Sequence, residues 1–137
     1  MSRLALDTSA AVPFLVRSHA ARAAVRRHVA DRTAVLTTHS LAETYSVLTR
    51  LPGDPRVAAP DAVRLVEANF GASLAVPATE ATALPRVLAP LGIAGGAVYD
   101  ALVGLAARAA GVPLVTRDAR ALGTYAALSV DVEIVAE

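Results

Sequence analysis

Apolar residues occur along the chain in two kinds of spacing, which predict its strands and its helices. Short runs rich in Val and Leu are typical of buried strands, whereas apolar residues three or four positions apart line one face of a helix. Strands are predicted at residues 4–7, 34–38, 73–79, 112–116 and 130–135. Helices are predicted at residues 8–16, 18–30, 40–50, 61–70, 79–91 and 97–110. Helices therefore separate all successive strands except the last two.

This order of elements is typical of an α/β fold. Strands that alternate with helices form a mostly parallel sheet with helices on both faces. We therefore expect one domain over residues 1–137, with a central five-stranded sheet whose last strand lies near an edge. Residues 51–60 form the one clear loop rich in Pro and Gly, and the sequence contains no internal repeat.

Four acidic residues stand alone at the borders of apolar segments. Asp7 and Asp118 follow the ends of two predicted strands, whereas Glu43 and Asp100 fall in the first turns of predicted helices. In open parallel sheets, ligands bind beyond the carboxyl ends of the strands, so these side chains are expected to gather there. A buried carboxylate without a partner is costly, and a shared cation removes that cost. Because hard oxygen ligands suit Mg²⁺ or Mn²⁺, the pattern predicts a metal-dependent site for phosphate chemistry.

Each of these acids also has a purely structural explanation. Asp7 is a candidate N-cap for the helix that follows it, and Glu43 completes a capping-box pattern with Ser40. Asp100 suits the positive end of a helix dipole. Asp118 suits a turn, or an ion pair with the arginine two residues later. The functional interpretation depends on all four acids occurring together at one end of the predicted sheet.

Composition narrows the class of protein without naming a function. Hydrophobic residues make up 55% of the chain, which is above the usual 45–50% or so, while aromatic residues make up only 4%. Stacking platforms for bases are therefore scarce. The chain has no cysteine, which excludes disulfides and thiolate metal sites. The longest uncharged run, residues 87–99, is too short to cross a bilayer, so we expect a cytoplasmic protein without a membrane partner.

The charged and polar residues outside the four acids carry weaker signals. Net charge is +1, and all 13 basic residues are arginine, whose planar fork suits phosphate; a GC-rich codon bias explains the same composition. Thr8 and Thr116 adjoin the predicted site, where their hydroxyls are placed to hold carboxylates or water, although strand ends often carry threonine. His39 also lies near the site, but a surface or capping histidine is the simpler interpretation. Sequence patterns of serine hydrolases, P-loops and dinucleotide-binding folds are absent.

Three segments, in order and spanning nearly the whole chain, resemble one known family. They are "LALDTSAAVPFL", "THSLAETYSVLTRL" and "GAVYDALVGLAARAAGVPLVTRDARAL". The chain resembles the PIN domain, and in particular the VapC-type toxins of bacterial toxin–antitoxin pairs. The last segment is the most specific, with an Asp that opens an apolar helix, then Gly, then a strand that ends in Thr-x-Asp. One departure is that the family often has an aromatic residue soon after Thr-x-Asp, where Leu122 stands here.

The resemblance implies a central parallel sheet and a Mg²⁺- or Mn²⁺-dependent endoribonuclease. The family's four acids fall on Asp7, Glu43, Asp100 and Asp118, and the Thr of Thr-x-Asp falls on Thr116. Asp7 and Asp100 are expected to bind the metal directly. Asp118 is expected to bind a second metal or to hold a bound water. Glu43 is expected to orient or deprotonate the attacking water. Arg117 and Arg120 are nearby candidates for substrate phosphates.

The resemblance also implies partners and a class of substrate. It implies a structured cellular RNA of the tRNA or rRNA class, a cognate antitoxin and a homodimer. The helices at residues 40–50 and 61–70 suit a partner segment. One alternative is a silent PIN-like binding module whose acidic pocket holds an arginine of a partner. A DNA nuclease of the same fold and a small phosphohydrolase are further alternatives, although "LDTSA" lacks the second Asp that the phosphohydrolase needs.

Overall fold

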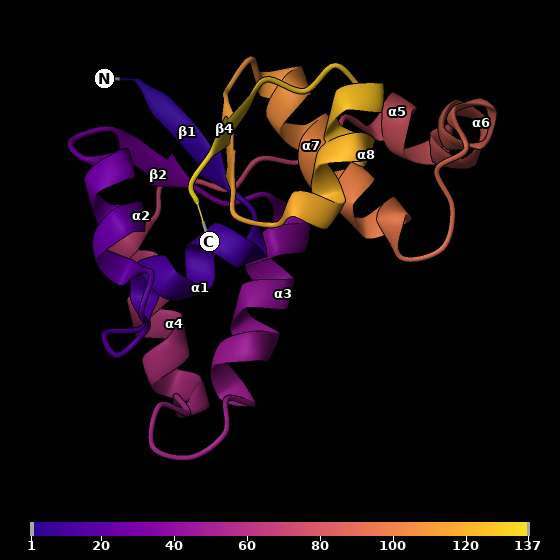
Figure 1. Ribbon diagram of the computed structural model, residues 1–137. Coiled ribbons are helices and arrows are strands. Elements are labelled where there is room, and N and C mark those ends of the chain that lie inside the picture. Colours follow the sequence, from indigo (N-terminus) through magenta and orange to yellow (C-terminus); the bar gives the residue numbers. More distant parts are fainter. Residues whose placement is uncertain (1, 137) are drawn as a thin grey trace.

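A computed structural model describes residues 2–136. Its strands form one sheet in the order β2-β1-β3-β4, and every neighbouring pair is parallel. The strands are β1 (Arg3–Leu6), β2 (Thr33–Val35), β3 (Leu114–Thr116) and β4 (Val132–Ile134). The predicted α/β class with a parallel sheet is confirmed, and the last strand lies at an edge as expected (Figure 1).

The sheet has four strands among the described residues, so the prediction of five was wrong. The missing strand was expected at residues 73–79, where the pairing is reduced to a single bridge between Thr37 and Leu74. The N–H of Leu74 donates to the carbonyl of Leu36 at 2.9 Å, and the Leu74 carbonyl accepts from Thr38 at 2.8 Å. Pro77 lacks an N–H and begins the turn into the next helix, so the ladder cannot continue.

Helices occupy both sides of the sheet (Figure 1). They are α1 (Thr8–Leu15), α2 (Arg22–Val29), α3 (Thr38–Thr49), α4 (Ala59–Asn69), α5 (Ala78–Thr82), α6 (Leu84–Leu88), α7 (Ala97–Ala110) and α8 (Leu122–Ala127), with short 3₁₀ turns η1 (Ala89–Leu91) and η2 (Ala119–Ala121). Alternate residues of β1 face the two layers. Leu4 and Leu6 pack with residues of α1 to α4, whereas Ala5 packs with residues of α7 and α8. All three are fully buried, which makes β1 a central strand.

Of two helical predictions, one differs from the structure and the other agrees with it. The single helix predicted at residues 79–91 is divided into α5, α6 and η1. Pro85 lies at the start of α6, where a proline has no N–H to give to a continuous helix. By contrast, α7 spans Ala97–Ala110 as predicted and ends at Gly111, whose φ of 68° is favourable for glycine.

No helix within residues 2–136 has the length and apolar character needed to span a membrane.

Candidate active site

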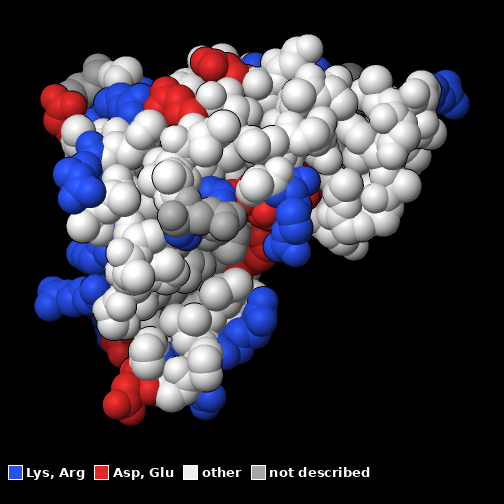
Figure 2. Space-filling view, viewed as in Figure 1, with Lys and Arg blue, Asp and Glu red and all other residues white. Residues whose placement is uncertain are grey.

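The four acids predicted from the sequence line one pocket of about 260 Å³ at the carboxyl ends of β1 and β3. The pocket is lined by Asp7, Thr8, Ser9, His39, Glu43, Val47, Arg50, Tyr99, Asp100, Val103 and Asp118. Figure 2 shows acidic atoms recessed in a hollow near the middle of the visible face, with basic side chains at its rim. The structure therefore brings together side chains that the sequence separates by up to most of its length.

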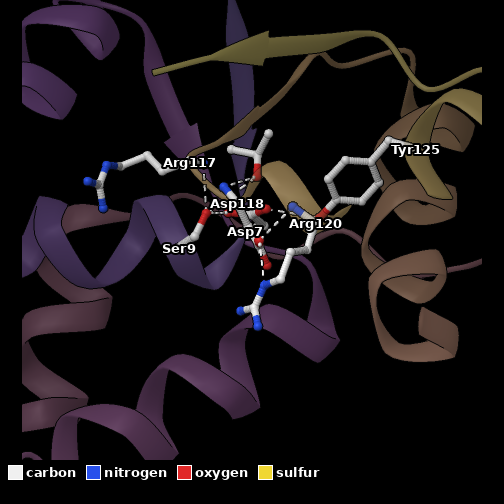
Figure 3. Close-up of polar contacts among 7 residues, drawn as sticks. Asp7, Ser9, Arg117, Asp118, Arg120 and Tyr125 are labelled. Atoms are coloured by element: carbon white, nitrogen blue, oxygen red, sulfur yellow. Dashed lines mark hydrogen bonds and ion pairs between the residues drawn. The ribbon is translucent and has the colours of Figure 1, made fainter. Parts of the chain in front are cut away.

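Asp7 is buried and held by several donors. It is the N-cap of α1, and its Oδ1 accepts from the Ala10 N–H at 3.3 Å and from the Ser9 hydroxyl at 2.5 Å. Its Oδ2 accepts from the Tyr125 hydroxyl at 2.9 Å (Figure 3). Burial raises the pKa of Asp7, and the hydrogen bonds from Ser9, Thr116, Tyr125 and Ala10 only partly offset that rise. The N-cap interpretation is confirmed, and it leaves this carboxylate inside the pocket.

Asp100 lies in the first turn of α7 and is half-buried. Burial is the main cause that raises its pKa, and the charges of Asp118, Asp7 and Glu43 raise it further. The proximity of His39 acts in the opposite direction. Asp100 therefore experiences the combined field of the other three acids, which is a repulsion that a bound cation would remove.

Glu43 is exposed and accepts a hydrogen bond from the Thr8 hydroxyl. The capping box between Ser40 and Glu43 was a wrong prediction, because α3 begins earlier. Thr37 is the N-cap: its hydroxyl accepts from the Ser40 N–H at 3.0 Å, and its own N–H donates to the Ser40 hydroxyl at 2.9 Å. Glu43 accordingly lies one turn further into α3 than expected, and its carboxylate faces the pocket.

At the end of β3, Asp118 and Thr116 belong to a chain of polar contacts. Figure 3 shows Asp118 in this chain, with Ser9, Arg117 and Arg120 around it. The Asp118 N–H donates to the Thr116 hydroxyl at 3.1 Å, and Asp118 accepts from the Arg120 N–H at 3.0 Å. The Arg117 N–H donates to the Ser9 hydroxyl at 2.8 Å, which ties this strand end to α1. Arg120 also lies 3.4 Å from Asp118, but its side chain is 93% exposed, so that ion pair contributes little to stability.

Sequence reasoning missed two residues that hold Asp7. Ser9 follows Asp7 by two positions and looked like an ordinary helix-start residue. Tyr125 lies in α8, a helix that was not predicted. Its hydroxyl donates to Asp7, which lies 118 residues earlier in the chain. The family that the sequence resembles often has an aromatic residue soon after Thr-x-Asp, where Leu122 stands here. Tyr125 lies three positions beyond Leu122 and was not considered for that place.

The donor set suits a hard divalent cation by its chemistry. The pocket offers carboxylate and hydroxyl oxygens, which are the ligands that Mg²⁺ and Mn²⁺ prefer. As they stand, no three His, Asp or Glu side chains within residues 2–136 are arranged to hold one ion. A shared ion therefore requires a change of rotamer, for which the exposed Glu43 and the half-buried Asp100 have more freedom than the bonded Asp7.

Residues 4–127 match the family model of the PIN domain. The chain belongs to the PIN domain family. It is 55% identical over 133 residues to Ribonuclease VapC27 of Mycobacterium tuberculosis, with 97% of each chain covered. It is 45% identical to Ribonuclease VapC40 of the same species, with 96% of this chain and 98% of the relative covered. The predicted place among VapC-type PIN domain proteins, and the predicted enzyme class of ribonuclease, are confirmed.

Solved structures of VapC and VapBC proteins share the fold. VapC20 of Mycobacterium tuberculosis, a Sarcin-Ricin loop cleaving toxin, aligns with a TM-score of 0.69 over 93% of this chain and 95% of its own, at 18% identity. VapBC2 from Rickettsia felis, bound to a DNA fragment from its promoter, aligns with a TM-score of 0.67 over 96% and 98%, at 16% identity. At these identities the likeness establishes the fold alone.

Proposed function

We propose that this protein is a Mg²⁺- or Mn²⁺-dependent endoribonuclease that acts as the toxin of a toxin–antitoxin pair in the cytoplasm. The observation that carries the proposal is the pocket in which Asp7, Glu43, Asp100 and Asp118 meet. Its relatives are named ribonucleases, and one structural neighbour is a toxin that cleaves the sarcin-ricin loop. We extend this to a structured RNA of the tRNA or rRNA class as substrate.

The residues divide the chemistry between them. Asp7 and Asp100 would hold the cation, with Asp7 fixed by Tyr125 and Ser9 and with Asp100 supplying the more adjustable carboxylate. When bound, the cation supplies positive charge for the phosphodiester transition state and activates water as the nucleophile. Glu43 would orient or deprotonate the attacking water, and Thr8 holds the Glu43 carboxylate in place. Asp118 would hold a second ion or a water, and the hydrogen bond from its N–H to the Thr116 hydroxyl sets its position.

The arginines near the pocket offset its repulsion of RNA. Arg117 was a sequence candidate, but its side chain does not line the pocket and points away from Asp7 and Asp118 (Figure 3), toward His19, whose pKa its charge helps to lower. Arg120 was the other candidate, and its nearly fully exposed side chain is placed for a phosphate at the rim. Arg50 lines the pocket itself and was not singled out by sequence reasoning. Phosphate contacts of this kind position a nucleic acid without reading its bases.

The partners in this proposal are a cognate antitoxin and a second copy of the chain. Structural neighbours include VapBC proteins, one of them described as a member of a family of toxin–antitoxin systems. A groove of about 400 Å³ between α3 and α4 is lined largely by apolar side chains, among them Leu41, Tyr45, Val66 and Phe70. An amphipathic segment of an antitoxin suits such a groove. The homodimer rests on family analogy.

The test uses purified protein, freed of antitoxin, with total cellular RNA. New 5′ ends are mapped by sequencing after addition of Mg²⁺ or Mn²⁺, with EDTA and Asp100→Asn as controls. Discrete ends that vanish in both controls establish a metal-dependent endoribonuclease and reveal its target. A matched single-stranded and duplex DNA arm separates a ribonuclease from a DNA nuclease. If the folded protein neither cleaves RNA nor binds either metal, the proposal fails in favour of the silent binding module.

A further inference from the structure

Two aromatic rings are stacked at the acidic pocket. The rings of His39 in α3 and Tyr99 in α7 have centroids 5.3 Å apart and planes inclined by 13°. Both residues line the pocket, and Tyr99 precedes Asp100 directly in the sequence. The side chain of Tyr99 is 56% exposed, so much of this large ring is open to solvent. The proposed roles of the acids do not use either ring.

The chain has few aromatic side chains, and its other Phe and Tyr residues lie outside the acidic pocket. Phe14 and Phe70 pack against each other at 5.6 Å. Tyr125 is fully buried, and Tyr45 lines the groove between α3 and α4. Among the described Phe and Tyr residues, Tyr99 is therefore the one that lines the acidic pocket.

The stack lies on the same helix faces as the proposed catalytic groups. His39 and Glu43 lie one turn apart on α3, and Arg50, the C-cap of this helix, follows seven residues after Glu43. On α7, Tyr99 and Asp100 both face the pocket, and Val103 follows one turn later. A nucleotide adjacent to a phosphate in the pocket would therefore lie within reach of the rings.

The charges of the pocket explain why an uncharged contact is useful there. Four carboxylates repel the phosphates of RNA, so phosphate contacts alone are a poor source of affinity at this point. A base carries no charge, and stacking on an aromatic ring is worth about 1–3 kcal/mol per base. The Nε2 of His39 is also buried, and the His39 ring covers one face of the Tyr99 ring, which leaves the other face for a base.

We infer that Tyr99, backed by His39, forms a stacking platform for an unpaired base next to the phosphate that is cut, while Arg50 binds a neighbouring phosphate. The ligand class is a single-stranded or flipped-out nucleotide of RNA, which is how proteins commonly read bases in structured RNA. This inference rests on the proposed ribonuclease function and deepens it, because it names a recognition contact for the substrate.

The test measures the affinity of fluorescein-labelled oligoadenylate and of an abasic oligomer of the same length by fluorescence anisotropy. The proteins compared are the full-length wild type, Tyr99→Phe, Tyr99→Ala and the control Tyr45→Ala, which removes an exposed ring outside the acidic pocket. Wild type and Tyr99→Phe are expected to bind oligoadenylate about 5- to 150-fold more tightly than the abasic oligomer. Tyr99→Ala is expected to lose most of that difference, and Tyr45→Ala is expected to keep it.

Two results would overturn the inference: equal binding of both oligomers by the wild type, or the same preference for oligoadenylate in Tyr99→Ala as in Tyr45→Ala. Circular dichroism and melting temperature show whether each variant is folded. Cleavage of total RNA by the same preparations is a separate arm. Absence of cleavage by the wild type contradicts the proposed function, whereas cleavage combined with base-independent binding contradicts only the stacking platform.

Discussion

Asp7 and Asp100 share one pocket but are held in opposite ways. Burial raises the pKa of both carboxyls. At Asp7, hydrogen bonds from Tyr125, Ser9 and the start of α1 stabilise the charged form. At Asp100, the remaining influences are mainly the negative charges of other acids, which disfavour it. One carboxylate is thus fixed by the protein, and the other is left to be neutralised by something the protein binds.

The contrast distinguishes a ligand that the protein fixes before a cation binds from a ligand whose repulsion the cation relieves. A metal ligand that accepts hydrogen bonds from neighbouring groups keeps its geometry, and the loss of such a neighbour commonly lowers metal affinity or activity by about 10- to 100-fold. A ligand in an unfavourable field gains most when a cation arrives, because the repulsion disappears at that moment. The two aspartates are therefore expected to respond differently to the same substitution.

The largest combined effect is expected from Asp7→Asn. An asparagine amide cannot accept hydrogen bonds at both of its polar atoms, so either Tyr125 or Ser9 and Ala10 lose their acceptor. We expect activity to fall more than about 100-fold, because a direct ligand matters more than an outer partner. The free energy of unfolding is expected to fall by about 1–3 kcal/mol. Urea denaturation measures this, and a variant as stable as the wild type would contradict the account of Asp7 as a fixed anchor.

Asp100→Asn is expected to lower cleavage activity as strongly as Asp7→Asn does, while the protein stays folded. Here the substitution removes a charge that the other acids repel, so the metal-free melting temperature is expected to equal or exceed that of the wild type. Differential scanning fluorimetry in EDTA provides the comparison with Asp7→Asn. Normal cleavage by Asp100→Asn would overturn the assignment of the site.

Tyr125→Phe tests the hydrogen bond by which α8 holds Asp7 in the site. Loss of the hydroxyl removes the donor to Asp7 Oδ2 while the buried ring stays. Activity is expected to fall about 10- to 100-fold, in the range for outer partners of metal ligands. Tyr45→Phe, which loses an exposed hydroxyl in the other groove, is the matched control and is expected to behave as the wild type. Equal kcat/KM in both variants would remove Tyr125 from the account.

The smallest expected effect is a change in how the stability of the metal-free protein depends on pH. Both aspartates have folded-state pKa values above their ordinary value of 3.8. A raised pKa means that the folded protein binds protons more tightly than the unfolded chain. Their contribution to stability is therefore fully present below pH 3.8 and is lost as pH rises through the raised values.

The slope of stability against pH in EDTA is expected to be less negative over this range in Asp100→Asn than in the wild type. Chemical denaturation at a series of pH values measures both slopes. Identical slopes would show that Asp100 is not repelled in the way proposed.

The sequence predicted the structure correctly where local patterns of residues agree with the overall fold. Asp7 and Asp118 follow strand ends, and parallel strands bring such ends to one edge, so their meeting was predictable. The apolar helix α7 was predictable because Gly111 marks its end and its periodicity is uninterrupted. Each of these inferences depends on a local pattern, either an acid just after a strand or a glycine just after an apolar helix.

The predictions were wrong where two nearby residues could serve the same structural role, or where a contact between distant parts of the chain determined the structure. Thr37 and Ser40 are both good capping residues, and Thr37 was selected because the chain leaves the sheet there in an extended conformation. Residues 73–79 have strand-like composition, but Pro77 stops the ladder after a single bridge. The contact between Tyr125 and Asp7 depends on how α8 packs over the sheet, which periodicity does not encode.

The most direct test of the account is a calorimetric titration of Mn²⁺ into wild-type protein, Asp100→Asn and the distal control Tyr45→Ala, with RNA cleavage measured on the same samples. The account predicts that the wild type and Tyr45→Ala bind Mn²⁺ and cleave RNA, and that Asp100→Asn stays folded but loses both properties. Equal Mn²⁺ affinity in the wild type and Asp100→Asn, or RNA cleavage that persists without bound metal, would contradict it.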